Sequence, residues 1–189
     1  MTESEVLEEL ERVGAVSNGH FLLSSGRHSD RYVEKFRALE DPGLAMRLGE
    51  AIAERFRDRR VEVVLSPAVG ALLLGFATAS AIGARFVFCE REDGEMRLRR
   101  GFRIREGEAV LVVEDVVTTG ASVSEVVRLV PPESLAGVGA LVDRSEGASD
   151  VAFTALVRLE ASSWAPEDCP LCARGAPLEA PGSRHLAGT

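Results

Sequence analysis

The chain has little lysine, few histidines and no long apolar run. Lys35 is the only lysine among 22 basic residues, so arginine must supply almost all of the positive charge. No apolar stretch approaches the length of a membrane span, and the acidic N-terminus lacks the basic start of a signal peptide. The net charge of −8 disfavours nucleic acid, whose phosphate backbone is usually met by a basic surface. We therefore expect a cytoplasmic protein with neither a membrane nor a nucleic-acid partner.

What is present fits one compact α/β domain. The length of 189 residues and a hydrophobic content of 46% suit a single substantial core. Residues Thr2 to Val13 read as a capped amphipathic helix, and Asp41-Pro42 starts a second helix that runs to about Arg59. Further helices are expected at 71–82 and 122–130, alternating with strands near 61–65, 85–89, 109–113, 138–142 and 153–159. This alternation predicts a doubly wound, mainly parallel sheet.

We expect three segments along the chain. Residues 1–40 form the N-terminal helix and a small covering segment, residues 41–160 form the core, and residues 161–189 form a C-terminal tail. The end of the tail, after Pro177, is rich in proline, glycine and serine and is expected to fray.

The most informative stretch runs from Val110 to Val123. An apolar strand ends in Glu114 and Asp115, and a small, hydroxyl-rich turn follows before a helical pattern begins. In open parallel sheets the carboxyl ends of strands bind ligands, and a turn that opens a helix presents free N–H groups to an anion. The turn, Thr118 to Ser122, is therefore a candidate phosphate site, and the two acids before it suit sugar hydroxyls.

This stretch resembles the ribose-phosphate motif of type I phosphoribosyltransferases, which bind 5-phosphoribosyl 1-diphosphate. The resemblance implies that the acid pair holds the ribose 2- and 3-hydroxyls while the turn holds the 5-phosphate. An acidic strand end followed by an ordinary capped helix is the alternative. The residues that the resemblance assigns to phosphoribosyl diphosphate are Glu114, Asp115, Val116, Val117, Thr118, Thr119, Gly120, Ala121 and Ser122.

Residues Phe21 to Tyr32 resemble the hood segment of orotate phosphoribosyltransferases, which lies over the active site. A further apolar strand ends at Val142-Asp143-Arg144, where that family carries an arginine that pairs with the orotate carboxylate. A planar guanidinium suits such a two-point contact, although Arg144 could instead pair with Asp143 or Glu146. The tail is similar to that of a thermophile-type branch of the family. The orotate-binding residues implied are Thr118, Arg144, Ser25, Gly26 and Tyr32.

The chain departs from that family at three places that normally carry positive charge. The hood has Ser24 where many relatives have lysine, and the strand-end loop 66–70 also lacks the lysine common there. The mobile catalytic loop, 89–102, has neither lysine nor histidine. Arg91, Arg99 and Arg100 are then the predicted catalytic arginines beside Glu114 and Asp115, with Arg97 a further candidate. Their alternation with Met96 and Leu98 equally fits a plain amphipathic hairpin.

The three cysteines are Cys89, Cys169 and Cys172, and the last two form a Cys-Pro-Leu-Cys turn. Such a turn resembles half of a zinc site, which needs about four ligands. The remainder could come from Cys89, His185 or a partner subunit, and a free thiol pair or a labile disulfide is an equal alternative. The histidines show no metalloenzyme spacing, and His28 is expected in a solvated turn.

The implied reaction transfers the phosphoribosyl group to orotate, with Mg²⁺ on the leaving diphosphate, no direct protein ligand to that ion, and a homodimer sharing its active sites. Positive charge on the sugar and negative charge on the diphosphate must both be stabilised. Two alternatives remain at this point. One is a phosphoribosyltransferase for another base, and the other is a regulator that senses phosphoribosyl diphosphate without catalysis.

Overall fold

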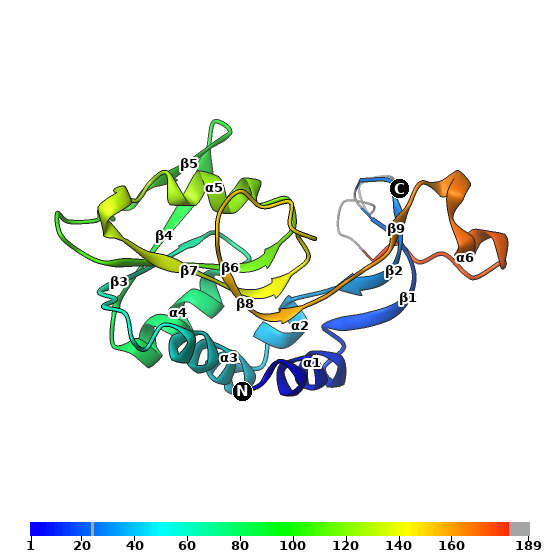
Figure 1. Cartoon of the computed structure of the whole chain (residues 1–189), viewed down its shortest axis with the longest axis horizontal. Helices are drawn as coiled ribbons and strands as arrows, with labels where there is room; N and C mark the ends of the chain where they lie inside the picture. The colour runs from blue at the N-terminus through cyan, green and yellow to red at the C-terminus, as the bar shows by residue number, and fades with distance from the viewer. Residues whose placement is uncertain (24, 182–189) are drawn as a thin grey trace.

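A computed structural model describes residues 1–23 and 25–181 and contains two sheets (Figure 1). The large sheet has the strand order β5-β4-β3-β6-β7-β8, and the small sheet has the order β1-β2-β9. The strands are β1 (Val16–Leu22), β2 (His28–Val33), β3 (Val63–Pro67), β4 (Arg85–Glu92), β5 (Glu95–Leu98), β6 (Val110–Val117), β7 (Leu135–Asp143), β8 (Thr154–Arg158) and β9 (Ser163–Trp164). The α-helices are α1 (Glu3–Arg12), α2 (Phe36–Leu39), α3 (Pro42–Arg55), α4 (Leu72–Ile82), α5 (Ala121–Val127) and α6 (Pro170–Ala173).

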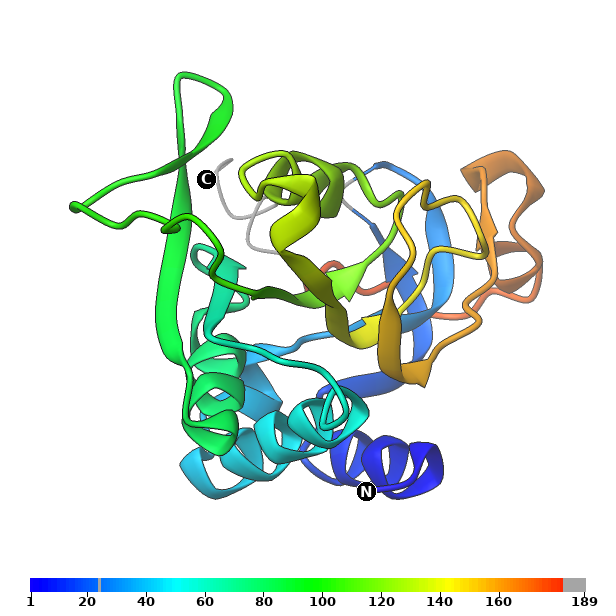
Figure 2. The same ribbon diagram turned by 60° about the vertical axis from the view of Figure 1, so that its left-hand side comes forward.

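The large sheet is parallel from β4 to β8, and only β5 runs antiparallel to its neighbour β4. Side chains of α1, α3 and α4 pack on one face of the sheet, and those of α5 pack on the other. Figures 1 and 2 both show α3 and α4 on the side of the sheet opposite α5. The predicted doubly wound α/β fold is confirmed.

Helix starts follow from local hydrogen bonds. Thr2 and Glu5 form a reciprocal capping box before α1, and the Asp41 side chain accepts N–H bonds from Gly43 and Leu44 at the start of α3. Helix α3 ends at Arg55, earlier than the predicted Arg59, and Phe56 turns its ring toward Gly137 and Gly139 of β7. The glycines give the ring room against the sheet. The four residues that follow are charged and exposed, so a further helical turn would bury no apolar side chain.

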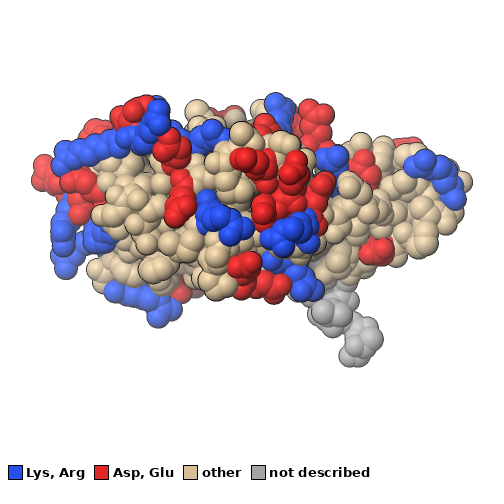
Figure 3. Space-filling view, turned by 90° about the horizontal axis from the view of Figure 1, so that it is seen from below, with Lys and Arg blue, Asp and Glu red and all other residues tan. Residues whose placement is uncertain are grey.

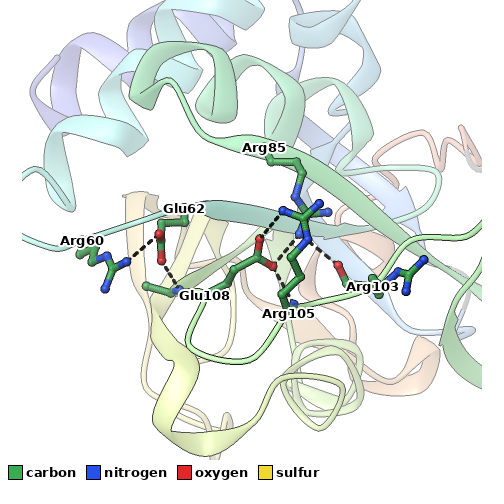
Figure 4. Close-up of polar contacts among 7 residues, drawn as sticks. Arg60, Glu62, Arg85, Arg103, Arg105 and Glu108 are labelled. Atoms are coloured by element: carbon green, nitrogen blue, oxygen red, sulfur yellow. Dashed lines mark hydrogen bonds and ion pairs between the residues drawn. The ribbon is translucent and has the colours of Figure 1, made fainter.

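The amino-terminal edge of the sheet is joined by ion pairs (Figure 4). The Glu108 carboxylate accepts a 2.6 Å bond from Arg85 and a 2.7 Å bond from the backbone N–H of Arg105. Glu62 accepts bonds from Arg60, at 2.7 Å, and from the N–H of Ala109, at 3.0 Å. These contacts bind the starts of β3, β4 and β6 to one another and leave the opposite edge for a ligand.

The small sheet and residues 161–181 of the tail lie together at one end of the molecule, on the right in Figure 1. Strands β1 and β2 form a hairpin, which we call the hood, and residue Glu179 of the tail pairs with Phe21 of β1. In Figure 3, charged side chains of both signs lie side by side over the large-sheet part, while the hood-and-tail end is mostly uncharged. Within residues 1–23 and 25–181, none of the helices combines the length and the apolar character needed to cross a bilayer.

Candidate active site

The large sheet reverses its winding between β3 and β6. From β3 the chain passes through α4 to β4 on one side, whereas β6 lies on the other side of β3 and leads on to β7. The loops that leave β3 and β6 therefore diverge at their carboxyl ends, which is where open α/β sheets bind ligands. These loops are 68–71 after β3 and Thr118 to Gly120 after β6.

Strand β6 continues through the two acids that the sequence placed at its end. Glu114 pairs in register with Ala140 of β7, and the strand extends to Val117. Both carboxylates are 5% exposed. Glu114 accepts a 3.1 Å bond from the Ser122 hydroxyl and a 3.0 Å bond from the Asp115 N–H, and Asp115 accepts a 2.6 Å bond from the Val116 N–H. The two acids are thus held in fixed positions by different partners.

Lys35 reaches this site, which reasoning from the sequence missed. Its Nζ lies 2.9 Å from Oδ2 of Asp115, although 79 intervening residues separate the two along the chain. Gly70 lies against both groups: a Cβ added there would stand 2.0 Å from Asp115 Oδ2 and 3.0 Å from Lys35 Nζ. The only lysine of the chain therefore lies beside both the acid and the strand-end loop that lacks its own lysine. The one signal in the sequence that could have identified Lys35 as a site residue is that it is the only lysine of the chain.

Burial and the neighbouring Asp115 carboxylate raise the pKa of Glu114 to about 8. The hydrogen bonds that Glu114 accepts from the Asp115 N–H and the Ser122 hydroxyl oppose this rise in its pKa without cancelling it. Glu114 therefore carries a proton for most of the time at neutral pH when no ligand is bound.

The raised pKa of Glu114 predicts a pH dependence of stability. Between its ordinary pKa of 4.5 and about 8, Glu114 keeps a proton in the folded protein that it releases in the unfolded chain. The free energy of unfolding therefore decreases as pH rises over this range, and the stabilisation by the bound proton is lost as pH passes about 8. We expect the melting temperature of the ligand-free protein to fall over this range relative to that of Glu114→Gln, which cannot titrate. Thermal unfolding across the range tests this, and parallel profiles for the two proteins would contradict it.

The turn after β6 has the geometry of a close-fitting loop. Gly120 has a φ of +77°, and a Cβ there would lie 2.4 Å from the Ser149 hydroxyl oxygen. Only glycine meets both conditions. Thr118 and Thr119 are exposed, and Ser122 lies in the first turn of α5 and bonds to Glu114. The predicted phosphate turn and the acid pair are therefore brought together in space.

Arg144 follows β7 at the same edge of the sheet, where its N–H donates a 2.8 Å bond to the Val117 carbonyl. Neither Asp143 nor Glu146 forms an ion pair with it within the described part of the chain, and Asp143 accepts bonds from Ser145 instead. Burial lowers the pKa of Arg144, and the negative charges of Asp30 and Glu146 oppose that effect. A half-buried guanidinium is thus left available to an anionic ligand.

The hood residues predicted to touch the base lie on the hairpin. Ser25 and Gly26 form its turn, with Gly26 at a φ of +78° and its N–H bonded to the Leu23 carbonyl at 2.9 Å. Tyr32 lies on β2, where its ring packs against Phe21 with centroids 5.6 Å apart. Ser24, the position of the missing hood lysine, lies outside the described residues.

The predicted catalytic arginines lie on the β4–β5 hairpin and the segment after it. Arg91 pairs with Glu125 of α5 at 2.6 Å, Arg99 with Glu92 at 3.0 Å, and Arg97 with Glu95 at 2.9 Å. Arg100 makes two 2.9 Å bonds to Glu90. The amphipathic-hairpin alternative describes this arrangement, and each arginine would have to leave a glutamate to reach a ligand.

A second group of reactive side chains lies between the hood and the tail. His20, His28, Cys169 and Cys172 come together, which corrects two expectations. His28 is 5% exposed, so it does not lie in a solvated turn, and Cys89 is buried in β4 near Ser66, away from the other cysteines. His185 lies outside the described residues.

Known proteins resemble the chain over nearly its whole length. The family model for the phosphoribosyl transferase domain matches residues 37–173. An orotate phosphoribosyltransferase of Caldanaerobacter subterraneus subsp. tengcongensis is 47% identical over 98% of this chain and 100% of its own length. One of Thermotoga petrophila is 48% identical over 96% of this chain and 99% of its own.

Solved structures of orotate phosphoribosyltransferases are also similar to this chain. The orotate phosphoribosyltransferase of Aeropyrum pernix has a TM-score of 0.63 and 27% identity, covering 82% of this chain and 93% of its own. The enzyme of Mycobacterium tuberculosis, in complex with inorganic phosphate, has a TM-score of 0.63 and 27% identity, covering 83% and 95%. On this evidence the chain belongs to the phosphoribosyltransferase family and, within it, to the orotate phosphoribosyltransferases.

Proposed function

We propose that the carboxyl edge of the large sheet is where this chain transfers the phosphoribosyl group of 5-phosphoribosyl 1-diphosphate to orotate, which yields orotidine 5'-phosphate and diphosphate. The observation that carries the proposal is the buried acid pair of β6, which adjoins the Thr118–Ser122 turn at the point where the sheet reverses its winding. The reaction type, transfer of a phosphoribosyl group to orotate, is inferred from the family to which the chain belongs.

The acid pair and the turn have separate tasks in the reaction. Asp115 and Glu114 accept hydrogen bonds from the ribose 2- and 3-hydroxyls and stabilise the positive charge that develops on the sugar. The turn, from Thr118 to Ser122 together with Val116 and Val117 before it, binds the 5-phosphate through N–H and hydroxyl groups. Anchoring the remote phosphate holds ribose C1 in line with the incoming nitrogen of the base.

Lys35 is the positive group best placed to serve the leaving diphosphate. Its ammonium adjoins Gly70 of the loop after β3, which in the family faces the diphosphate, and its ion pair with Asp115 holds it at the site before substrate arrives. Further positive charge can come from the hairpin arginines, Arg91, Arg99 and Arg100. Their glutamate partners are partly exposed, and such ion pairs are weak, so movement of the hairpin can free the arginines to approach the diphosphate.

The site suits a Mg²⁺ ion that arrives with the diphosphate. Mg²⁺ prefers oxygen ligands and keeps several waters, so the diphosphate, the ribose hydroxyls and water would supply its ligands. Asp115 is already paired with Lys35 at 2.9 Å, which agrees with the expectation that the ion takes no direct protein ligand. When bound, Mg²⁺ neutralises charge on the leaving group.

Arg144 is assigned to the orotate carboxylate, with Thr118, Ser25, Gly26 and Tyr32 around the base. We expect the enzyme to turn over orotate with Mg²⁺, and Arg144→Ala to lower kcat/KM for orotate by roughly one to two decades, since a charged hydrogen bond is worth about 1.5–3 kcal/mol. Steady-state kinetics would show KM for phosphoribosyl diphosphate almost unchanged. Absence of turnover by the parent enzyme across a panel of bases would overturn the proposed function.

Supporting a homodimer, α4 and the loop before it expose large apolar side chains: Val69 is 69% exposed, Phe76 59% and Leu73 49%. Such a patch suits the contact between two copies, as the family resemblance implies. We expect Phe76→Glu to convert the dimer to a monomer in size-exclusion chromatography with light scattering. Leu178→Glu, which alters a similarly exposed side chain on the tail, should leave the dimer intact, and a monomeric parent would refute the assignment.

A further inference from the structure

Four side chains that bind soft metal ions meet between the hood and the tail. His20 lies on β1, His28 begins β2, Cys169 precedes α6 and Cys172 lies within it. One candidate ligand atom from each lies within 4.8 Å of the other three. Two adjacent strands and a helix nearly 150 residues further along the chain thus contribute to one cluster, which lies far from the β4–β5 hairpin in Figures 1 and 2.

The spacing of the four atoms matches a tetrahedral zinc site. Zinc bonds of about 2.0–2.1 Å to nitrogen and 2.3 Å to sulfur place ligand atoms roughly 3.3–3.8 Å apart. His20 Nε2 lies 3.4 Å from Cys169 Sγ and 3.7 Å from Cys172 Sγ. His28 Nδ1 lies 3.3 Å from Cys172 Sγ, and the two ring nitrogens lie 2.9 Å apart. Of these four distances, the one between the two nitrogens is the only one below that range.

The hydrogen bonds around the cluster favour a cation at its centre. His20 Nδ1 lies 3.0 Å from the Ala176 carbonyl, which can only accept, so Nδ1 carries the proton and the Nε2 lone pair faces the cluster. Without a cation, His28 Nδ1, Cys169 Sγ and Cys172 Sγ all lie within 3.7 Å of Nε2, whose single lone pair can accept from only one of them. A bound metal would instead satisfy all four atoms, and the Ala176 contact is the outer-shell bond usual for a metal-binding histidine.

We propose that His20, His28, Cys169 and Cys172 bind one Zn²⁺ ion in a closed structural site. Two nitrogen and two sulfur ligands at tetrahedral spacing are typical of zinc, and four protein ligands leave no open position for catalysis. His20, His28 and Cys169 are each 5% exposed or less, so the site is shielded on most sides.

The ion clamps the tail onto the turn end of the hood. The tail already pairs with β1, since Leu22 N–H bonds to the Glu179 carbonyl and Glu179 N–H bonds to the His20 carbonyl, both at 2.8 Å. Because His20 and His28 flank the hood turn, zinc fixes both ends of the segment that carries Ser25 and Gly26. The consequence for orotate binding rests on the proposed function; the metal site itself does not.

The test starts with metal analysis of protein purified under reducing conditions without chelator. We expect one zinc per chain, and on replacement by Co²⁺ the absorption bands of a tetrahedral site with thiolate ligands. Removing zinc with 1,10-phenanthroline should lower the melting temperature by roughly 10 °C or more, and Zn²⁺ but not Mg²⁺ should restore it. The zinc-free enzyme should also show a higher KM for orotate.

Variants identify the ligands. His28→Ala and Cys169→Ser should each lose the stoichiometric zinc, whereas Cys89→Ala, which removes the cysteine outside the cluster, should retain it. The proposal is overturned if the reduced parent protein contains no zinc and also fails to give the cobalt bands. This outcome does not depend on the variants, so it holds even if one of them fails to fold. So does a Cys169–Cys172 disulfide in the native protein, or full zinc content in His28→Ala. Metal content is independent of orotate turnover, so failure here leaves the proposed function standing.

Discussion

Asp115→Ala is expected to lower kcat/KM by roughly two to four decades. Two charge-assisted hydrogen bonds to the ribose would be lost, at about 1.5–3 kcal/mol each and about 1.4 kcal/mol per decade. The loss would fall on kcat as well as on KM, because the carboxylate also stabilises positive charge that exists only in the transition state. Steady-state kinetics with both substrates varied measures this effect.

Controls separate the ribose contact from a general loss of folding. Asp58→Ala removes a carboxylate whose side chain is 94% exposed, and its kinetics should match those of the parent. Asp115→Asn keeps the shape of the side chain and should lose most of the activity while melting close to the parent. Activity of Asp115→Ala within tenfold of the parent would remove this residue from the ribose site.

Lys35→Met is expected to cost roughly two to three decades in kcat/KM. The substitution removes a positive charge from the diphosphate and leaves the buried Asp115 carboxylate without its partner at 2.9 Å, and an unsatisfied buried group costs about 1–3 kcal/mol or more. Negative charge on the diphosphate grows as the bond to ribose breaks, so kcat should fall more than the affinity for phosphoribosyl diphosphate. Presteady-state binding and steady-state kinetics together give both quantities.

Lys35→Arg is the matched variant, since it keeps the charge and changes the geometry of the donor. It should recover part of the activity, whereas a solely structural role for the pair with Asp115 would let Lys35→Met keep a normal kcat once the protein is folded. If kcat stayed normal, we would instead assign the neutralisation of diphosphate to the hairpin arginines, Arg91, Arg99 and Arg100.

Much of the fold followed from local patterns. The buried run before Glu114, the helical spacing after Ser122 and the caps at Thr2 and Asp41 each depend on contacts within a few residues, and the structure has a strand or helix at each. The predicted bounds of individual elements were wrong where the presence or absence of contacts with distant parts of the chain decides where a helix or strand ends. Helix α3 ends four residues early because the charged residues 57–60 are exposed and bury no apolar face against the core. Strand β6 runs through its acids because Glu114 and Val116 pair with β7.

The type of sheet and the acid pair with its turn could be predicted from the residues alone, because hydrophobic period and turn chemistry are local properties of the chain. Which distant groups meet could be learned only from the three-dimensional structure. Lys35 joins Asp115, and His20 and His28 join the two cysteines, because crossover connections and the pairing of the tail with β1 bring together segments between about 80 and 150 residues apart. No spacing along the chain encodes such an encounter, since it depends on how whole elements pack.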